Sequence, residues 1–370
     1  MKDVTVLHGH GYPSVVLILL SSVSIAAPAD DEALQRCAAV DDPLERLACY
    51  DTLAGRLPGS TEPKSRAEAG VEAPTSEAVR PSETPPPQPL AAQLQEGAPV
   101  AHLSYLSRQW ELDPEAKQGT FLLRPHKQNY LLPVRWSSSP NEQPRSPTQP
   151  APAAADLDNV EAKFQISLKT KVVEDLFGGH TDLWLAYTQQ SSWQVYNAPL
   201  SRPFRETDYE PELMMVIPVD RNVLGLQARF VNVGLLHQSN GRADPISRSW
   251  NRLYGQVGLE AGKFALLARA WYRIPEAADN DNNPDIEHYL GYGDLLAVYK
   301  WNPRNTVSLH IRNNLSTSDN KGSLQLDWSF PLHGRLKGYM QLFSGYGESL
   351  IDYNWRQTTF GVGVLLTDWM

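Results

Sequence analysis

The chain has 370 residues, 41% of them hydrophobic, and a formal net charge of −9 at pH 7. This length allows two or three domains, and the hydrophobic content excludes a chain that is disordered throughout. The acidic balance argues against a nucleic-acid partner, because contacts to the phosphate backbone need an excess of Lys and Arg.

The N-terminus carries the pattern of an export signal. An apolar run over residues 15–20 is followed by small residues up to Ala27-Pro28-Ala29, and Lys2 is the one Lys or Arg before the run. The pattern predicts a signal peptide over residues 1–29, with a single anchor helix as the alternative. No later segment holds 18 consecutive apolar residues, so a helical membrane domain is not expected.

Cys37 and Cys49, the only two cysteines, follow this signal. Export to an oxidising compartment favours a disulfide between them, and the pattern predicts two short helices joined by this bond over residues 30–54. A metal site would need more Cys or His nearby.

Residues 55–119 have the composition of a linker and lead-in. Between Gly55 and Val100 there are nine prolines and no aromatic residue. Such a segment cannot bury enough apolar surface to fold, so we expect a disordered, Pro-rich linker.

From residue 120 to residue 370 the chain alternates between apolar and polar residues. Phe164, Ile166 and Leu168, for example, alternate with Gln165 and Ser167. Runs of about ten residues with this period, with Trp and Tyr near their ends, are typical of a transmembrane β-barrel, although a soluble β-sandwich alternates too. Export, an even strand count and a final strand close to the C-terminus favour an all-β, twelve-stranded antiparallel barrel. The twelve runs lie near 125–136, 160–172, 180–193, 206–218, 223–238, 247–261, 263–274, 287–300, 305–315, 321–331, 335–346 and 355–368.

One predicted hairpin brings a histidine, a serine and an asparagine together. Folding the chain back about Asp244 places His237 opposite Asn251, and directly opposed residues have Cβ atoms about 5 Å apart. Ser239 lies two residues from His237 and therefore on the same face of the strand. A base, a nucleophile and an orienting amide on one face are what nucleophilic acyl transfer requires.

The predicted triad shares its face with apolar residues. Val231, Val233 and Leu235 have the parity of His237. In a soluble protein this face would be core, and the polar residues would only satisfy one another. On a barrel the same face contacts lipid, where a neutral amide is less costly than a carboxylate.

Four long motifs give the chain a specific resemblance. The chain resembles the outer-membrane phospholipase A family of bacteria over roughly residues 120–370. The motifs are Ala-Tyr-Thr-Gln-Gln-Ser-Ser-Trp-Gln at 186–194, Pro-Phe-Arg-Glu-Thr-Asp-Tyr-Glu-Pro at 203–211, the whole of 237–251, and Ser-Gly-Tyr-Gly-Glu-Ser-Leu-Ile-Asp-Tyr-Asn at 344–354.

The resemblance implies a calcium-dependent acyl hydrolase of glycerophospholipids in the outer membrane, with phospholipase A1, phospholipase A2 and lysophospholipase activity. It implies a catalytic triad of His237, Ser239 and Asn251, with the active site towards the outer leaflet. It places the backbone N–H of Gly241 in the oxyanion hole, and it implies a homodimer.

The resemblance also implies ligands for Ca²⁺. The carbonyl of Arg242 and the hydroxyl of Ser247 match family ligands, and Ser201 of the partner subunit would complete the set. A second family site matches Asp244 and Asn282. The family has an aspartate at the latter position, so the asparagine puts this second site in doubt.

Gln189 matches a glutamine that the family buries in the dimer seam, although it could instead line the barrel interior. A non-enzymatic barrel, such as a porin or a structural protein, remains the main alternative function, and a soluble secreted esterase is another. Nothing in the sequence identifies a partner for the N-terminal extension.

Overall fold

The computed structural model describes residues 36–53, 103–178, 180–334 and 336–369. The predicted signal peptide and most of the predicted linker lie outside these residues. The chain divides into two compact units, residues 1–84 and 85–370.

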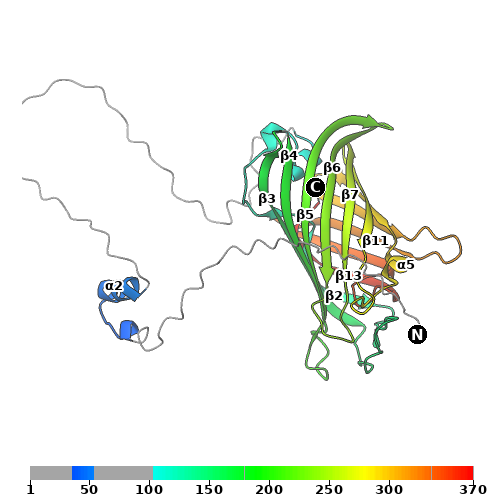
Figure 1. Ribbon diagram of the computed structural model, residues 1–370, viewed down its shortest axis with the longest axis horizontal. Coiled ribbons are helices and arrows are strands. Elements are labelled where there is room, and N and C mark those ends of the chain that lie inside the picture. Colours follow the sequence, from blue (N-terminus) through cyan, green and yellow to red (C-terminus); the bar gives the residue numbers. More distant parts are fainter. Residues whose placement is uncertain (1–35, 54–102, 179, 335, 370) are drawn as a thin grey trace, which may run out of the picture. The chain divides into compact units, whose positions relative to one another are not determined.

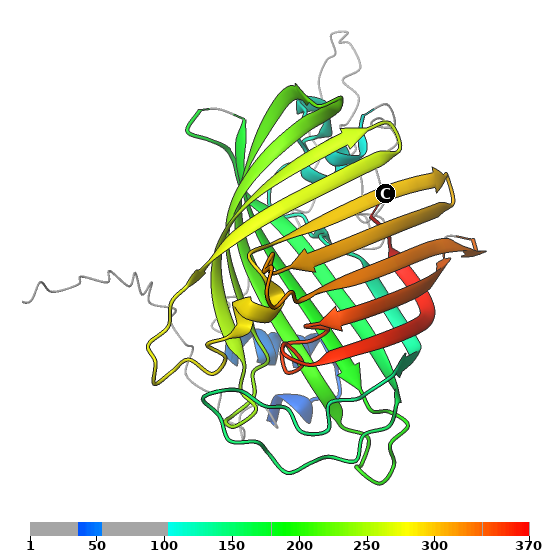
Figure 2. The ribbon, with the colours of Figure 1, turned by 90° about the vertical axis from the view of Figure 1, so that its right-hand side faces the viewer.

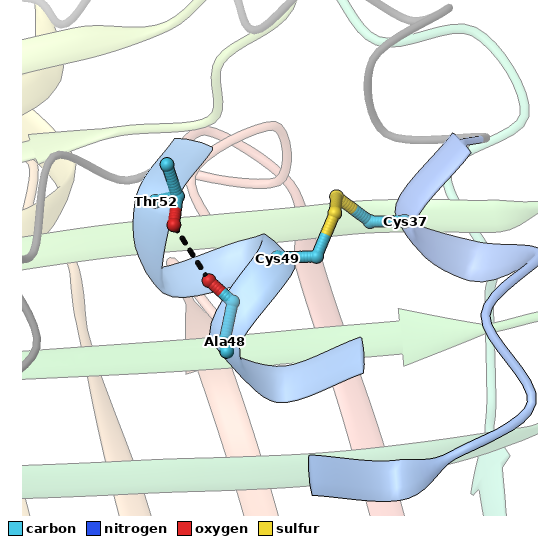
Figure 3. The surroundings of a disulfide bond; sticks show 4 residues. All are labelled: Cys37, Ala48, Cys49 and Thr52. Atoms are coloured by element: carbon cyan, nitrogen blue, oxygen red, sulfur yellow. Dashed lines mark hydrogen bonds between the residues drawn. A yellow bond between two sulfur atoms is a disulfide. The ribbon is translucent and has the colours of Figure 1, made fainter. Parts of the chain in front are cut away.

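A short helix and one disulfide characterise the N-terminal unit. Helix α2 spans Pro43–Leu53. Asp42 Oδ1 accepts a hydrogen bond from Glu45 N at 3.1 Å, and Pro43 suits the first helical position because it has no N–H to satisfy. The predicted disulfide is confirmed: Cys37 and Cys49 are bonded, with their Cα atoms 5.5 Å apart (Figure 3).

The second unit is an antiparallel β-barrel, as predicted (Figure 1). Each of its twelve long strands pairs with its neighbours, and β3 pairs with both β2 and β4, which closes the sheet. Within the described ranges, no helix is long and apolar enough to cross a membrane. The strands are β2 (Asn129–Ser137), β3 (Val160–Leu176), β4 (Thr181–Trp193), β5 (Phe204–Val223), β6 (Leu226–Ser239), β7 (Ser249–Ala261), β8 (Phe264–Ile274), β9 (Gly293–Asn302), β10 (Asn305–Asn313), β11 (Gly322–His333), β12 (Leu336–Tyr346) and β13 (Arg356–Thr367).

Two of the predicted runs begin four or more residues before the observed strands. The first run is interrupted, and a two-residue strand β1 (Arg124–Pro125) pairs with β3 ahead of β2. The eighth begins too early, because helix α5 (Ile286–Leu290) precedes β9. Ile286 and Leu290 are both buried and lie four residues apart, which is a helical rather than an extended spacing.

The barrel has an apolar outside and a charged inside. Leu235, Leu253 and Leu326 point outward and are 39–49% exposed. The interior holds buried ion pairs instead, such as Arg135 with Glu161 at 2.5 Å. This arrangement is that of a membrane barrel, in which lipid solvates the outer wall, and paired long side chains fill the interior.

The two ends of the barrel differ in the lengths of their connections (Figure 2). At one end, called here the short-turn end, strands are joined by turns such as 224–225, 262–263 and 303–304. At the other, the long-loop end, the connections are 138–159, 194–203, 240–248, 275–292, 314–321 and 347–355. Short turns at one side and long loops at the other are typical of outer-membrane barrels.

A segment before residue 120 packs into the short-turn end. Helix α4 (Tyr105–Trp110) begins at the capping residue Ser104. Leu106 N donates to Glu260 Oε2 at 3.1 Å, and Trp110 packs against Trp184 and Phe230. The folded unit therefore begins earlier than the predicted boundary at residue 120.

The sequence motifs meet at the long-loop end. Arg205 Nη1 donates to Asp352 Oδ2 at 2.8 Å, and Leu350 N donates to Asp208 Oδ2 at 3.0 Å, which joins the 203–211 and 344–354 motifs. Tyr353 OH donates to Asp285 Oδ1 at 2.6 Å. These contacts anchor the loops that surround the β6–β7 connection.

Candidate active site

The predicted hairpin is formed by β6 and β7. His237 pairs with Asn251, as the fold-back about Asp244 predicts, and Ser239 pairs with Ser249. The alternation of the two strands places His237 on the outer wall with Val233 and Leu235, which are 40% and 49% exposed. The apolar face is therefore the exterior of the barrel rather than a core.

His237 and Asn251 are in direct contact. His237 Nδ1 lies 2.8 Å from Asn251 Oδ1, a distance suited to a ring N–H that donates to the amide oxygen. This bond would leave Nε2 of the ring free to accept a proton. Ser239 is two residues further along the same face of β6, so the structure gathers all three predicted residues on one outward patch.

Asn240, which was not predicted from the sequence as a site residue, holds the loop after Ser239 in place through hydrogen bonds of its side chain. Asn240 Oδ1 accepts hydrogen bonds from Arg248 N at 2.9 Å and Arg242 N at 3.3 Å, and its Nδ2 donates to Ile246 O at 2.8 Å. Asn240 is thus buried beneath residues 241–248 and ties the two sides of the loop together. An asparagine at the end of a predicted strand and directly before a glycine is the sequence feature that indicates such a turn residue.

The backbone conformation at residue 241 favours glycine. Its φ is +61°, in the left-handed region that favours glycine, and a Cβ there would meet Tyr209 Cε2 at 3.0 Å. The residue is exposed beside the outward patch.

The residues predicted to bind calcium lie in the long-loop connections. Arg242, Asp244 and Ser247 share the 240–248 loop, and Ser201 is exposed in the 194–203 loop with a φ of +61°. The Arg242 guanidinium is turned towards the start of β5, where its Nη2 donates to the carbonyl oxygen of Phe204 at 2.8 Å. Over the described residues, no three His, Cys, Asp or Glu side chains form a metal-binding group.

Asn282 is connected to this loop through its side chain. Asn282 Nδ2 donates to Ser247 Oγ at 3.0 Å, and Asn282 Oδ1 accepts from Gln149 Nε2 at 2.6 Å. Three loops that are far apart in sequence therefore meet at Asn282. The contact with Gln149 could not be predicted from the sequence, because no sequence pattern relates residues in two separate loops.

Glu276 extends the His–Asn pair. Asn251 Nδ2 donates to Glu276 Oε1 at 2.9 Å. Partial burial and the nearby charge of Asp281 raise the pKa of the Glu276 carboxyl, whereas Arg273, the hydrogen bond from Asn251 and His237 act in the opposite direction. Glu276 lies in the 275–292 connection and was not identified as a site residue from the sequence.

Gln189 lies on the outer wall of β4 rather than in the interior. It shares its parity with Leu185 and Tyr187, which are 47% and 42% exposed. Its Nε2 donates to Ser191 Oγ at 3.3 Å, and its Oε1 accepts from Tyr187 OH at 3.3 Å.

A closed twelve-stranded barrel with an apolar wall, a charged interior and long loops at one end defines a bacterial outer-membrane β-barrel. Comparison with known proteins identifies the family of this barrel. Residues 106–366 match the family model described as Phospholipase A1. The chain belongs to the phospholipase A1 family.

Relatives and solved structures agree with this assignment. The chain is 39% identical over 248 residues to phospholipase A1 of Escherichia coli K12, covering 67% of this chain and 82% of that protein. A protein of Neisseria meningitidis serogroup B, named provisionally as a phospholipase A1, is 38% identical over 366 residues, which cover 95% of each chain. The structure of E. coli outer membrane phospholipase A matches with a TM-score of 0.60 and 35% identity, over 76% of this chain and 98% of that one. The Salmonella typhi outer membrane phospholipase dimer with bound calcium matches with a TM-score of 0.62 and 34% identity, over 72% and 100%.

Proposed function

We propose that the chain hydrolyses the acyl ester bonds of glycerophospholipids in the outer membrane, with His237, Ser239 and Asn251 as its catalytic triad. The observation that carries the proposal is the 2.8 Å contact between His237 Nδ1 and Asn251 Oδ1 on the lipid-facing wall, with Ser239 on the same face. Family membership supports the reaction class. A solved structure of the E. coli protein in which an active-site asparagine is replaced by alanine supports the role of an asparagine.

In the proposed reaction, each of the three residues of the patch has one role. Ser239 Oγ attacks the ester carbonyl carbon while His237 Nε2 takes the hydroxyl proton. Collapse of the tetrahedral intermediate breaks the bond to the glycerol oxygen, which receives that proton from His237. Water then attacks the acyl-serine, again deprotonated by His237, and releases the fatty acid and the free serine.

Asn251 keeps His237 in the productive tautomer. Its oxygen accepts a hydrogen bond from the Nδ1 proton, which leaves Nε2 unprotonated and able to take the proton of Ser239. The asparagine is itself neutral, so the group in direct contact with His237 on the lipid-facing wall is not a charge that lipid would have to desolvate. The family resemblance extends the proposed reaction to both acyl positions of the glycerol and to lysophospholipids.

The oxyanion would be stabilised by the Gly241 backbone N–H and by a calcium ion. The donors available in the 240–248 loop, the Arg242 carbonyl and the Ser247 hydroxyl, are hard oxygen ligands that fit Ca²⁺. When bound, the cation would supply electrostatic stabilisation to the oxyanion. Asp244 is exposed in the same loop, and Asn282 already hydrogen-bonds to Ser247, so a second cation there would compete with that bond.

We further propose that a homodimer completes the calcium site. Two ligands from one loop fall short of the six to eight that Ca²⁺ prefers, so Ser201 of the partner subunit and water would supply others. Gln189, a polar amide on the lipid-facing wall, would lie in the seam and hydrogen-bond to its counterpart there. The calcium-bound dimer of the Salmonella typhi phospholipase supports this arrangement.

A porin-like role is the alternative, and the barrel interior argues against it. Arg135, Lys163 and Lys171 are almost fully buried there and are paired with carboxylates. An open channel would leave these side chains in water. The test is a hydrolysis assay on the refolded barrel with phospholipid in mixed micelles, with and without calcium. Hydrolysis by the unmodified chain and its loss in Ser239→Ala would support the proposal, whereas equal rates would refute it.

A further inference from the structure

We infer that Glu276 is a positioning residue of this active site: its carboxylate orients the Asn251 amide, so that the catalytic unit is a relay of four residues. The inference rests on the proposed function, because it assigns a role relative to the same triad. It concerns a residue in a connection between strands rather than in the β6–β7 hairpin.

An asparagine amide can be placed in two orientations of opposite hydrogen-bonding character. The two ends of an asparagine side chain have nearly the same shape, but one donates and the other accepts hydrogen bonds. With its oxygen towards His237, Asn251 accepts the Nδ1 proton and leaves Nε2 free as the base. With its NH₂ group towards His237, it would require an unprotonated Nδ1 and would place the proton on Nε2. That tautomer cannot deprotonate a serine.

Glu276 removes this ambiguity. Its Oε1 lies 2.9 Å from Asn251 Nδ2. An ionised carboxylate only accepts hydrogen bonds, so it selects the amide orientation in which nitrogen faces Glu276 and oxygen faces His237. The observed contact of 2.8 Å between His237 Nδ1 and Asn251 Oδ1 is the consequence.

Glu276 also acts on His237 through its charge. His237 becomes positively charged when it takes the serine proton. The negative charge of Glu276, which is hydrogen-bonded to the far side of Asn251, favours that state. The charged groups that act on Glu276 are Asp281, Arg273 and His237 itself. Arg273 is committed to Asp281, with Nη2 to Oδ1 at 2.7 Å, so Glu276 is left to act on the His–Asn pair.

Substitution of Glu276 separates orientation from charge. Glu276→Ala removes both, so kcat should fall about tenfold, the value of one charge-assisted hydrogen bond, with KM changed less than twofold. Glu276→Gln keeps an oxygen that can accept from Asn251 and should retain kcat within about threefold. Because this variant loses the negative charge, the imidazolium is less favoured. The acid-side midpoint of its rate–pH profile should therefore move down by roughly half a pH unit.

The matched control is Glu287→Ala. Glu287 is a carboxylate of the same connection, it is also partly exposed, and burial raises its pKa as well. In the described part of the chain, no hydrogen bond or ion pair joins its side chain to the triad. Its kcat and its pH profile should match those of the unmodified chain, and heat-modifiable mobility on gels should verify that every variant is folded.

Two combined variants complete the test. In an Asn251→Ala background, Glu276→Ala should cost less than about threefold, because the amide that it orients is gone and only the effect of its charge on His237 remains. Asn251→Asp alone places two carboxylates in contact and should be poorly active, whereas Asn251→Asp with Glu276→Gln restores a donor and an acceptor and should recover activity. The inference is overturned if Glu276→Ala matches Glu287→Ala, or if its loss is fully additive with that of Asn251→Ala. Hydrolysis that persists in Ser239→Ala would instead refute the proposed function.

Discussion

The contact between Asn251 and His237 makes a quantitative prediction for Asn251→Ala. The change removes the oxygen that lies 2.8 Å from His237 Nδ1, on a patch of the outer wall where lipid excludes much of the water. In the transition state this bond is made to an imidazolium, and a hydrogen bond to a charged group contributes about 1.5–3 kcal/mol. The expected loss in kcat is therefore about 10- to 150-fold.

The loss in Asn251→Ala should be smaller than that in Ser239→Ala, which removes the nucleophile and should cost at least about three orders of magnitude. Both variants are to be assayed with phospholipid in mixed micelles at saturating calcium, after gel mobility has established that the barrel is folded. A loss in Asn251→Ala as large as that in Ser239→Ala, or no loss at all, would refute the assigned division of roles.

The remaining predictions concern the termini, the cation and the dimer. Deleting residues 30–102 should leave a folded, active barrel, whereas Trp110→Ala should destabilise it by about 3–5 kcal/mol in a denaturant titration, because α4 packs inside the short-turn end. Removing calcium with a chelator should abolish hydrolysis without changing gel mobility. Ser201→Phe should weaken calcium-dependent crosslinking and activity together, since the two are thermodynamically linked, and unchanged crosslinking would contradict the shared site. Gln189→Leu should weaken dimerisation and leave the mobility of the monomeric barrel unchanged.

The sequence predicts those parts of the molecule that follow a short period. Alternation every two residues located the strands, and the symmetry of residues 237 and 251 about Asp244 set the register of β6 and β7, which the structure confirms. These features depend on local geometry alone, because a strand places alternate side chains on opposite faces.

The features that were missed depend on loops. Glu276 reaches Asn251 because of the path of the 275–292 connection, and Gln149 meets Asn282 across more than a hundred residues. The two-residue repeat of the strands does not extend into the loops, so it cannot predict contacts between residues of this kind. Helix α4 was also missed, since six residues are too few to establish a helical pattern and Pro-rich sequence precedes it.

The central claim is that Ser239, on the lipid-facing wall, is the acylated nucleophile. The most direct measurement is to treat the refolded barrel with a sulfonyl fluoride in the presence of calcium and to locate the adduct by peptide mass spectrometry. The account predicts a single modified residue, Ser239, with label and hydrolytic activity lost in parallel, and no label in His237→Ala. Full hydrolytic activity after Ser239 is labelled, or a stoichiometric adduct at another serine that tracks the loss of activity, would contradict it.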